Sequence, residues 1–145
     1  MLTSRAMKWL AAGVFLLAPV LPAQTAPDAP QPVATMKQLM VDVIHPASNA
    51  LLLFIHRGGP ADDKEWAEAR RSAMTLAESV NLLLLRNRAA TWAADAKLLT
   101  DAGRDAYKAA EGKDVKALAA LSDRIDASCT TCHRQFRPAI FPPSR

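Results

Sequence analysis

The chain has 145 residues, of which 50% are apolar and 22% are charged, and its formal net charge is +4. This length allows one domain with a packed core and excludes two ordinary domains, while the scarcity of aromatic and β-branched residues favours helices over strands. The sequence holds no long block of lysine and arginine, which argues against a nucleic-acid partner because such domains concentrate these residues on one face.

The first 23 residues have the pattern of a secretory signal peptide rather than of a folded element. Arg5 and Lys8 form a basic start, an apolar run covers residues 9–20, and Ala23 offers a small residue for cleavage. The run is shorter than the roughly 20 residues of a membrane span. We therefore expect cleavage and a periplasmic mature chain without a membrane segment, with an uncleaved anchor as the alternative. Cleavage removes the two positive charges of Arg5 and Lys8 and leaves +2 of the net +4.

A proline-rich linker is predicted at residues 24–33, and the folded domain at residues 34–145. The linker contains Pro27, Pro30 and Pro32, which favour an extended chain over a packed element. No internal repeat divides the domain that follows.

The first predicted helix covers residues 35–56, with Thr35 as its N-cap. Apolar residues recur along it in steps of three or four, at Met36, Met40, Val43, Ala47, Leu51 and Phe54. Pro46 falls inside this helix and is expected to kink or divide it, because its ring removes one backbone hydrogen bond.

Three more helices are predicted after the first, joined by short turns. One begins at Asp62, which forms an acidic capping box with Glu65, and ends near residues 86–88. The next covers residues 91–110. The last begins near Asp114, runs through the two cysteines and is closed by the prolines that follow them. Four helices and no credible strand predict an all-α fold, an antiparallel four-helix bundle.

The most informative motif is Cys129-Thr130-Thr131-Cys132-His133, which contains both cysteines of the chain. The C-x-x-C-H spacing is the attachment signal of a c-type haem. On a helix, a spacing of three places both sulfurs nearly on one side, where they can reach the two vinyl groups of one porphyrin. The adjacent imidazole can then ligate the iron. The motif predicts one covalent haem c per chain, held by Cys129 and Cys132 and ligated by His133.

Three other interpretations of the cysteine pair stay open. A disulfide would close so short a loop that it would restrain the unfolded chain very little. A redox-active C-x-x-C pair usually lies at a helix N-terminus, whereas this pair lies late in a helix, where the dipole disfavours a thiolate. A zinc site needs a fourth ligand beside Cys129, Cys132 and His133. Haem is therefore the favoured interpretation.

Residues 127–137 resemble the C-terminal C-x-x-C-H-x-x-[FY]-[RK] signature of the class II c-type cytochromes, the cytochrome c-prime family. The resemblance implies a four-helix bundle with haem near the C-terminus, and it implies that a first-helix residue faces the distal side of the iron. A methionine there gives six-coordinate iron suited to electron transfer, whereas a bulky apolar residue leaves five-coordinate iron that binds small gases. By the same resemblance, Arg137 pairs with a haem propionate or caps the last turn, a solvated arginine being the alternative. Dimerisation is common in the family, so a homodimer is possible.

The distal residue is expected in the first helix. The family pattern Arg-Gln-x-x-Met or Leu has a loose counterpart in residues 36–40, with its arginine replaced. Met40 lies in the apolar stripe about one helical turn from Met36, so Met40 is the favoured sixth ligand and Met36 the second choice. On a regular helix, His45 would point about 140° away from Met40, and His56 would lie about 24 Å further along the axis. Two alternatives stay open: iron without a sixth protein ligand, in which these methionines only fill the core, and, least favoured, a histidine as the sixth ligand.

Together these features predict an electron carrier rather than an enzyme. It would cycle between ferric and ferrous iron and dock briefly with redox partner proteins. The distal His-Arg pair of a peroxidase is not evident in the sequence. The alternative function is a module that binds small gases such as NO or CO, in which Met40 only lines the distal side of the haem.

Overall fold

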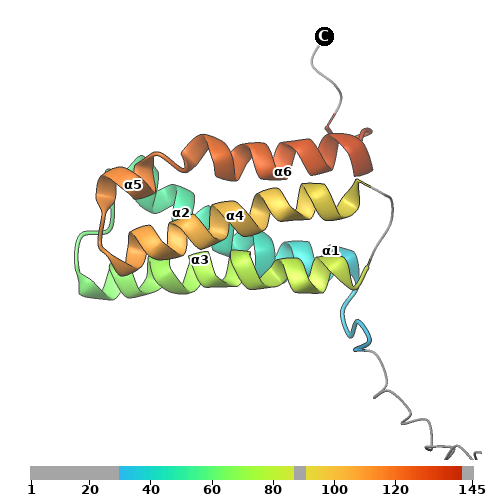
Figure 1. Cartoon of the computed structure of the whole chain (residues 1–145), viewed down its shortest axis with the longest axis horizontal. Coiled ribbons are helices and arrows are strands. Elements are labelled where there is room, and N and C mark those ends of the chain that lie inside the picture. Colours follow the sequence, from blue (N-terminus) through green and yellow to red (C-terminus); the bar gives the residue numbers. More distant parts are fainter. Residues whose placement is uncertain (1–29, 87–90, 142–145) are drawn as a thin grey trace, which may run out of the picture.

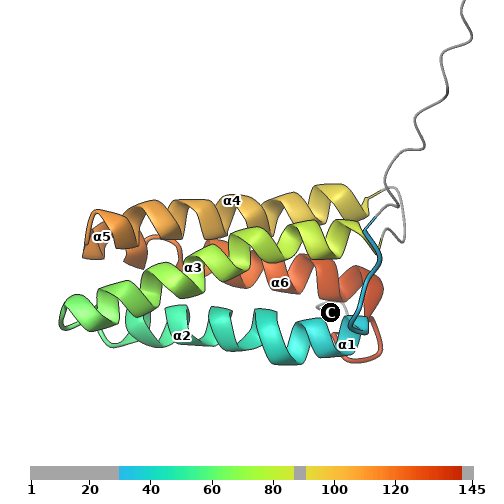
Figure 2. The same ribbon diagram turned by 90° about the horizontal axis from the view of Figure 1, so that it is seen from below.

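The computed structural model describes residues 30–86 and 91–141, and within these ranges it is helical, without a strand (Figure 1). The predicted signal peptide and most of the predicted linker lie outside the described residues. The helices run side by side along one long axis and enclose a common core (Figures 1 and 2). The prediction of an all-α bundle is confirmed at this level.

The first helical run covers the predicted residues but is built differently from a single α-helix. It consists of α1 (Met36–Gln38), the π-helix η1 (Leu39–Ile44) and α2 (His45–His56). Thr35 caps it as predicted, because its hydroxyl accepts a hydrogen bond from the Gln38 backbone at 3.2 Å.

The predicted division of the run at Pro46 is confirmed as a change of helix type, because η1 ends and α2 begins just before the proline. The chain widens in η1, where the His45 N–H donates to the Met40 carbonyl five residues back. Pro46 then lies in the first turn of α2, a position at which a missing N–H costs little. The helical run therefore continues through Pro46, and the local adjustment falls on residues 39–44.

By length and composition, this first run is also apolar enough to cross a membrane. Its most apolar 18-residue window has a mean hydropathy of 1.4 and is 28% buried. Its buried residues pack into the bundle, while Val41 and Leu53 are more than half exposed. Core helices and export signals have the same length and composition, so this property by itself is weak evidence for a membrane span.

The two longest helices, α3 (Asp63–Leu84) and α4 (Trp92–Glu111), form the most extensive contact of the fold. Asp62 caps α3, and its carboxylate accepts the Glu65 N–H at 2.8 Å. Only this half of the predicted capping box forms, because the Glu65 carboxylate accepts from the Ala61 N–H at 2.7 Å instead of reaching back to Asp62.

The predicted last helix is two helices, α5 (Val115–Ala119) and α6 (Ser122–Phe136). A turn between them lets the successive apolar residues Leu118, Leu121 and Ile125 all reach the core. The helix α6 ends two residues before Pro138, as predicted, since the residue preceding a proline is disfavoured in the helical conformation.

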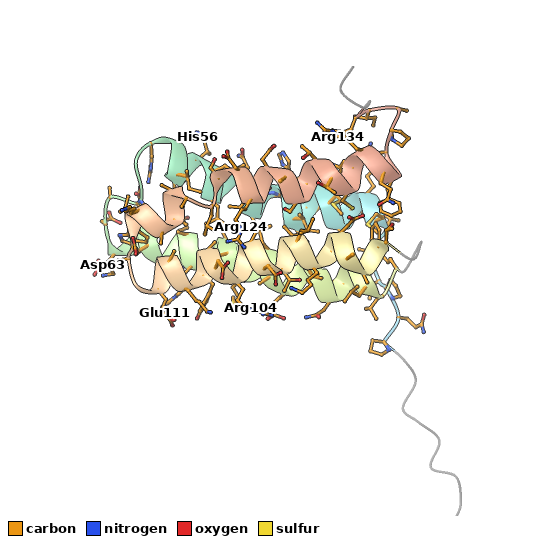
Figure 3. The ribbon with its side chains drawn as sticks, turned by 45° about the horizontal axis from the view of Figure 1, so that its top comes forward. His56, Asp63, Arg104, Glu111, Arg124 and Arg134 are labelled. Carbon is orange, nitrogen blue, oxygen red and sulfur yellow. The ribbon has the colours of Figure 1, made fainter. Side chains whose placement is uncertain are left out.

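Charged side chains lie on the outside of the bundle, among them Arg104 and Arg134 (Figure 3). Arg124 of α6 donates to Asp105 of α4 at 2.8 Å, and both side chains are about half exposed. An exposed pair of this kind contributes about 1 kcal/mol or less to stability. The apolar core therefore carries most of the cohesion of the fold.

Small residues set the close approach of α3 and α4. Ala69, Ala73 and Ala106 are fully buried between these helices. Gly103 of α4 faces Ala77 of α3 so closely that an added Cβ would lie 2.7 Å from the Ala77 backbone nitrogen. The α3 backbone leaves no room for a methyl group there.

We expect Gly103→Ala to destabilise the fold by about 1–3 kcal/mol, because a backbone atom rather than a flexible side chain blocks the new methyl group. Gly112→Ala is the matched control: its Cβ would meet the Lys108 carbonyl at an ordinary 3.5 Å, and its φ of −80° suits alanine. Its stability should change by less than about 1 kcal/mol. Chemical denaturation measures both, and equal unfolding free energies would contradict the close helix approach.

Candidate functional site

The C-x-x-C-H motif lies in the second half of α6, at the end of the bundle that also holds α1 and the start of α4 (Figure 1). Cys129 and Cys132 are free, partly buried thiols spaced by three residues along the helix. Ile125 is fully buried one turn before the motif, and Phe136 meets the Trp92 ring edge-on at a centroid distance of 4.8 Å after it. The motif is therefore held between two anchoring contacts.

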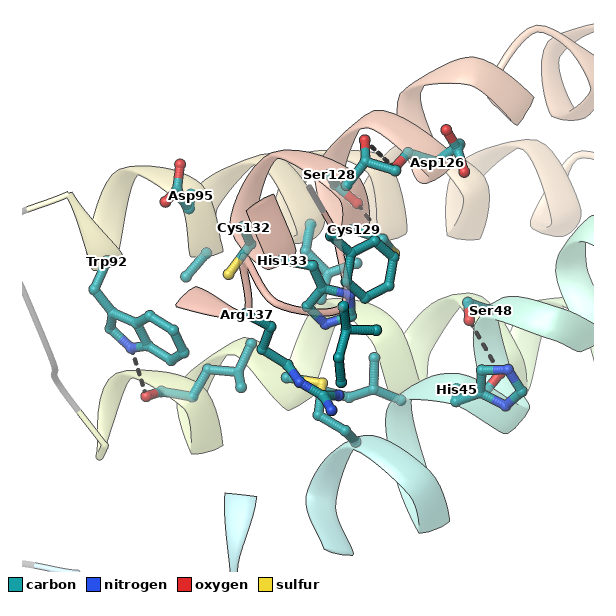
Figure 4. A pocket seen from close by; sticks show the side chains of 18 of the residues that line it. His45, Ser48, Trp92, Asp95, Asp126, Ser128, Cys129, Cys132, His133 and Arg137 are labelled. Carbon is teal, nitrogen blue, oxygen red and sulfur yellow. Dashed lines mark hydrogen bonds between the residues drawn. The ribbon is translucent and has the colours of Figure 1, made fainter. Parts of the chain in front are cut away.

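A cavity of about 420 Å³ lies beside the motif (Figure 4). Both cysteines and His133 line it from α6, and its other walls come from η1, α2, α3 and α4. A second cavity of about 480 Å³ shares Met40, Cys132 and His133 with the first. Volumes of about 300–1,000 Å³ with mostly apolar walls are typical of cofactor sites.

The chain beyond α6 folds back over this cavity. The backbone N–H groups of Ile140 and Phe141 both donate to the Arg137 carbonyl at 3.0 Å. This turn places Ile140 and Phe141 on the cavity wall, and the Phe141 ring lies 4.7 Å from the His133 ring. The sequence did not predict this segment as part of the site, because Pro138, Pro142 and Pro143 around it indicated only the end of the helix.

The structure brings the predicted site residues together. Met40 and Arg137 line both cavities with Cys132 and His133, and Cys129 lines the first. Met36 lines only the second cavity, which does not include Cys129. Their roles as ligands and haem contacts stay predictions, and the geometry favours Met40 over Met36.

The expected position of His45 is wrong. His45 was expected to point away from Met40, but both residues line the first cavity. Figure 4 labels His45 at the edge of this cavity. The expectation assumed the 100° step of a regular α-helix, whereas the intervening residues form the π-helix η1. His56, at the far end of α2, lines neither cavity.

Burial keeps the two thiols protonated. It raises the pKa of Cys129 above its ordinary value. Burial, with the Asp95 carboxylate and the neighbouring Cys129, raises the pKa of Cys132 to about 11. A redox-active cysteine pair needs the opposite, a lowered pKa that supplies thiolate near neutral pH. The electrostatics of the site therefore disfavour the redox-active interpretation.

Burial, with a smaller contribution from Arg137, lowers the pKa of His133. The imidazole is therefore neutral at physiological pH, which is the form that binds metals. Within residues 30–86 and 91–141, however, no group of three or more histidine, cysteine and acidic side chains is placed to hold a metal ion. The site thus lacks the four-ligand set of a structural zinc ion but suits iron in a porphyrin, which needs only axial protein ligands.

Two wall residues of α4 were not predicted as part of the site. Trp92, expected in the core, is buried and also lines both cavities, and its indole N–H donates to the Leu83 carbonyl at 2.8 Å. Asp95 follows it by three residues, and its Oδ2 atom is buried without a hydrogen-bond partner in the described part of the chain. The sequence did contain a signal for Asp95: this acidic residue lies at helical spacing on the same apolar face as Trp92 and Leu99.

The site fits a haem in its chemistry. Largely apolar walls suit the porphyrin ring, and two free thiols on one side of α6 suit its two vinyl groups. A neutral imidazole stands next to the thiols, and the Arg137 guanidinium is available for an anionic propionate. The buried, unpartnered Asp95 oxygen also indicates that the cavity wall is adapted to something other than protein.

Comparison with known proteins gives no match to a protein-family model, to a curated protein or to a solved structure. The resemblance to class II c-type cytochromes therefore rests on residues 127–137 and on the helical fold. Function is inferred from the residues and geometry of this chain.

Trp92→Phe should destabilise the protein by about 1 kcal/mol, because the buried hydrogen bond to the Leu83 carbonyl is lost while the aromatic contact to Phe136 can remain. Tyr107→Phe is the control, since the hydroxyl of the half-buried Tyr107 makes no hydrogen bond within residues 30–86 and 91–141. Urea denaturation compares the two variants. Equal unfolding free energies of the two variants would mean that the indole hydrogen bond does not stabilise the contact between α3 and α4 at the cavity wall.

Proposed function

We propose that the protein is a periplasmic c-type cytochrome that carries electrons through one covalently bound haem. The observation that carries this proposal is the meeting of the C-x-x-C-H motif, the Met40 thioether and the Arg137 guanidinium around one largely apolar cavity (Figure 4). When bound, the haem supplies a one-electron couple between ferric and ferrous iron.

Cys129 and Cys132 would hold the porphyrin. Each thiol would add across one vinyl group: the S–H bond would break, a C–S bond would form and the hydrogen would go to the neighbouring vinyl carbon, with no net oxidation. The protonated thiols would supply that hydrogen. His133 follows Cys132 directly on α6, so the helix that would hold the ring would also supply an imidazole ligand for the iron.

Met40 would ligate the iron from the distal side. It is half-buried in η1 and lines both cavities with His133. Thioether sulfur favours ferrous iron, so Met40 would raise the reduction potential relative to two nitrogen ligands. Single π-turns within helices are frequent at functional sites, which supports a role for η1. Arg137 would pair with a propionate through a charge-assisted hydrogen bond.

The finer architecture is part of the same proposal. The first helical run, α3, α4 and the α5–α6 pair are four successive elements joined by short connections. They fit the antiparallel four-helix bundle implied by the resemblance to class II c-type cytochromes.

Export and docking complete the proposed role. The signal-peptide pattern of residues 1–23 would deliver the chain to the periplasm, where haem attachment would follow. Val41 and Ile140 line the first cavity and are 55% and 58% exposed. Exposed apolar side chains beside a redox centre suit brief contact with redox partner proteins. A homodimer stays a prediction.

Covalent attachment can be tested with Cys129→Ser/Cys132→Ser in a host that exports the chain and matures c-type cytochromes. The double variant should lose all haem on a denaturing gel, because neither side chain can form a thioether. Thr131→Ala, at an exposed position between the cysteines, should keep its haem. Haem that stays with the double variant after denaturation would refute attachment through these sulfurs.

The gas-binding alternative is favoured by one observation: the first cavity is lined not only by Met40 but also by His45 and Ser48. The ferric optical spectrum separates the two functions. An electron carrier with a Met40 ligand should be low-spin, with a sulfur-to-iron charge-transfer band at the red end. High-spin iron that readily binds CO or NO after reduction would favour gas binding.

Asp95→Asn should raise the midpoint potential of the holoprotein, because the negative charge of a partly buried carboxylate with one fully buried oxygen would favour the ferric state. Asp126→Asn is the matched control: Asp126 lines the same cavity but is exposed, so solvent and salt screen its charge. Spectroelectrochemical titration measures both. A potential that is unchanged in Asp95→Asn, or that shifts equally in the two variants, would contradict a direct effect of the Asp95 charge.

A further inference from the structure

Two possible iron ligands, Met40 of η1 and His45 at the start of α2, line the first cavity together with α6. Figure 4 labels His45 at the edge of this cavity. We infer that His45 is an alternative axial ligand that takes the place of Met40 on the distal side of the haem iron. This inference rests on the proposed function, since it needs a haem bound at His133.

The backbone of η1 places the two side chains on one face. The His45 N–H donates to the Met40 carbonyl, so the two residues stand one π-turn apart. In an α-helix, the backbone N–H bonds to the carbonyl four residues back, and those two residues lie on the same face. In a π-helix the bonded residues are five apart, which is the spacing of Met40 and His45. Regular α-helical geometry would separate the two side chains by about 140° instead.

Pro46 explains why the wide turn lies at this point. It has no N–H to donate to the carbonyl of Asp42, and its ring would clash with that carbonyl in a regular helix. Widening the preceding turn avoids the clash and leaves His45 among the residues that line the cavity, at its edge beside Ser48 (Figure 4). The Ser48 hydroxyl then donates to the His45 carbonyl at 3.0 Å, which satisfies a carbonyl near the π-turn.

Both side chains share the cavity with the proximal residues. Met40, His45, Cys129 and His133 all line the first cavity, whereas the second includes Met40 and His133 but not His45. The first cavity therefore brings together the attachment motif, the Met40 thioether and the His45 imidazole. Because Met40 lines both cavities with His133 and His45 lines only the first, Met40 would be the first ligand and His45 its replacement.

The His45 imidazole is free to act as a ligand. Within the described residues, its ring makes no hydrogen bond, ion pair or aromatic contact, and the side chain is exposed at the cavity edge. Imidazole nitrogen suits ferric iron, whereas the softer thioether sulfur favours ferrous iron. The exchange should therefore be most evident in the ferric protein when the thioether is absent.

The test compares ferric holoproteins carrying Met40→Ala, Met40→Ala/His45→Ala and Met40→Ala/His56→Ala by optical and electron paramagnetic resonance spectroscopy. Met40→Ala should lose the sulfur-to-iron band but stay low-spin with two-imidazole ligation. Removing His45 as well should give high-spin iron. His56→Ala is the matched control, a histidine of the same helix that lines neither cavity, and it should leave the Met40→Ala spectrum unchanged.

A second readout uses CO binding to the ferrous proteins. The Met40→Ala/His45→Ala variant should bind CO about tenfold more tightly than Met40→Ala, because no protein ligand must first leave the iron. High-spin iron in Met40→Ala, with the same CO affinity as the double variant, would overturn the inference. Met40→Leu keeps the side-chain volume and replaces Met40→Ala if that variant does not fold.

These outcomes are separable from failure of the proposed function. Haem that is lost on denaturation of the wild type refutes covalent attachment, whichever distal ligand is present. A wild type that retains haem but lacks the sulfur-to-iron band refutes Met40 as its ligand. In that case, loss of the low-spin signal in His45→Ala supports the inference, and its retention overturns it.

Discussion

The site depends on one constraint: two thiols and an imidazole lie within five consecutive residues of α6. The other helices that line the cavity must therefore be held in place next to this short segment. Contacts on either side of the motif hold them there. Ile125 is fully buried before it, and after it Phe136 packs edge-on against Trp92. The Gln135 amide adds a hydrogen bond to the Thr91 hydroxyl at 2.7 Å. Because the Trp92 indole also donates a hydrogen bond to the Leu83 carbonyl, α3, α4 and α6 are linked to one another around the cavity.

The opposite wall is set by η1, and its shape follows from burial and from one proline. Leu39 and Ile44, at the two ends of η1, are both buried, which anchors the π-helix in the core while Met40 remains half-buried beside the cavity. Pro46 favours the wide turn because it cannot donate the next hydrogen bond. A wide turn in a helix weakens its regular hydrogen bonding, and such turns persist where they serve a site. Here the turn leaves both Met40 and His45 among the residues that line the first cavity with His133.

The sequence predicted the parts of the molecule that depend on local pattern. Periodic apolar residues and caps such as Thr35 and Asp62 indicated the helices, and the C-x-x-C-H spacing indicated the cysteines and histidine that line the cavity. It could not predict η1, because a π-turn has no distinctive residue pattern and the steps of three and four assume regular geometry. The same assumption misplaced His45. The division at Leu121 and the return of Phe141 to His133 depend on tertiary packing, which a local pattern does not contain.

The central claim is that the mature chain carries one haem through two thioether bonds. The most direct measurement is the intact mass of the wild-type protein, purified from a host that exports it and matures c-type cytochromes, and denatured in acid before analysis. The expected mass is that of the processed chain plus one haem, with the haem absorption in the same chromatographic peak. A colourless chain at its unmodified mass, or lighter by the two hydrogens lost in a Cys129–Cys132 disulfide, would contradict it.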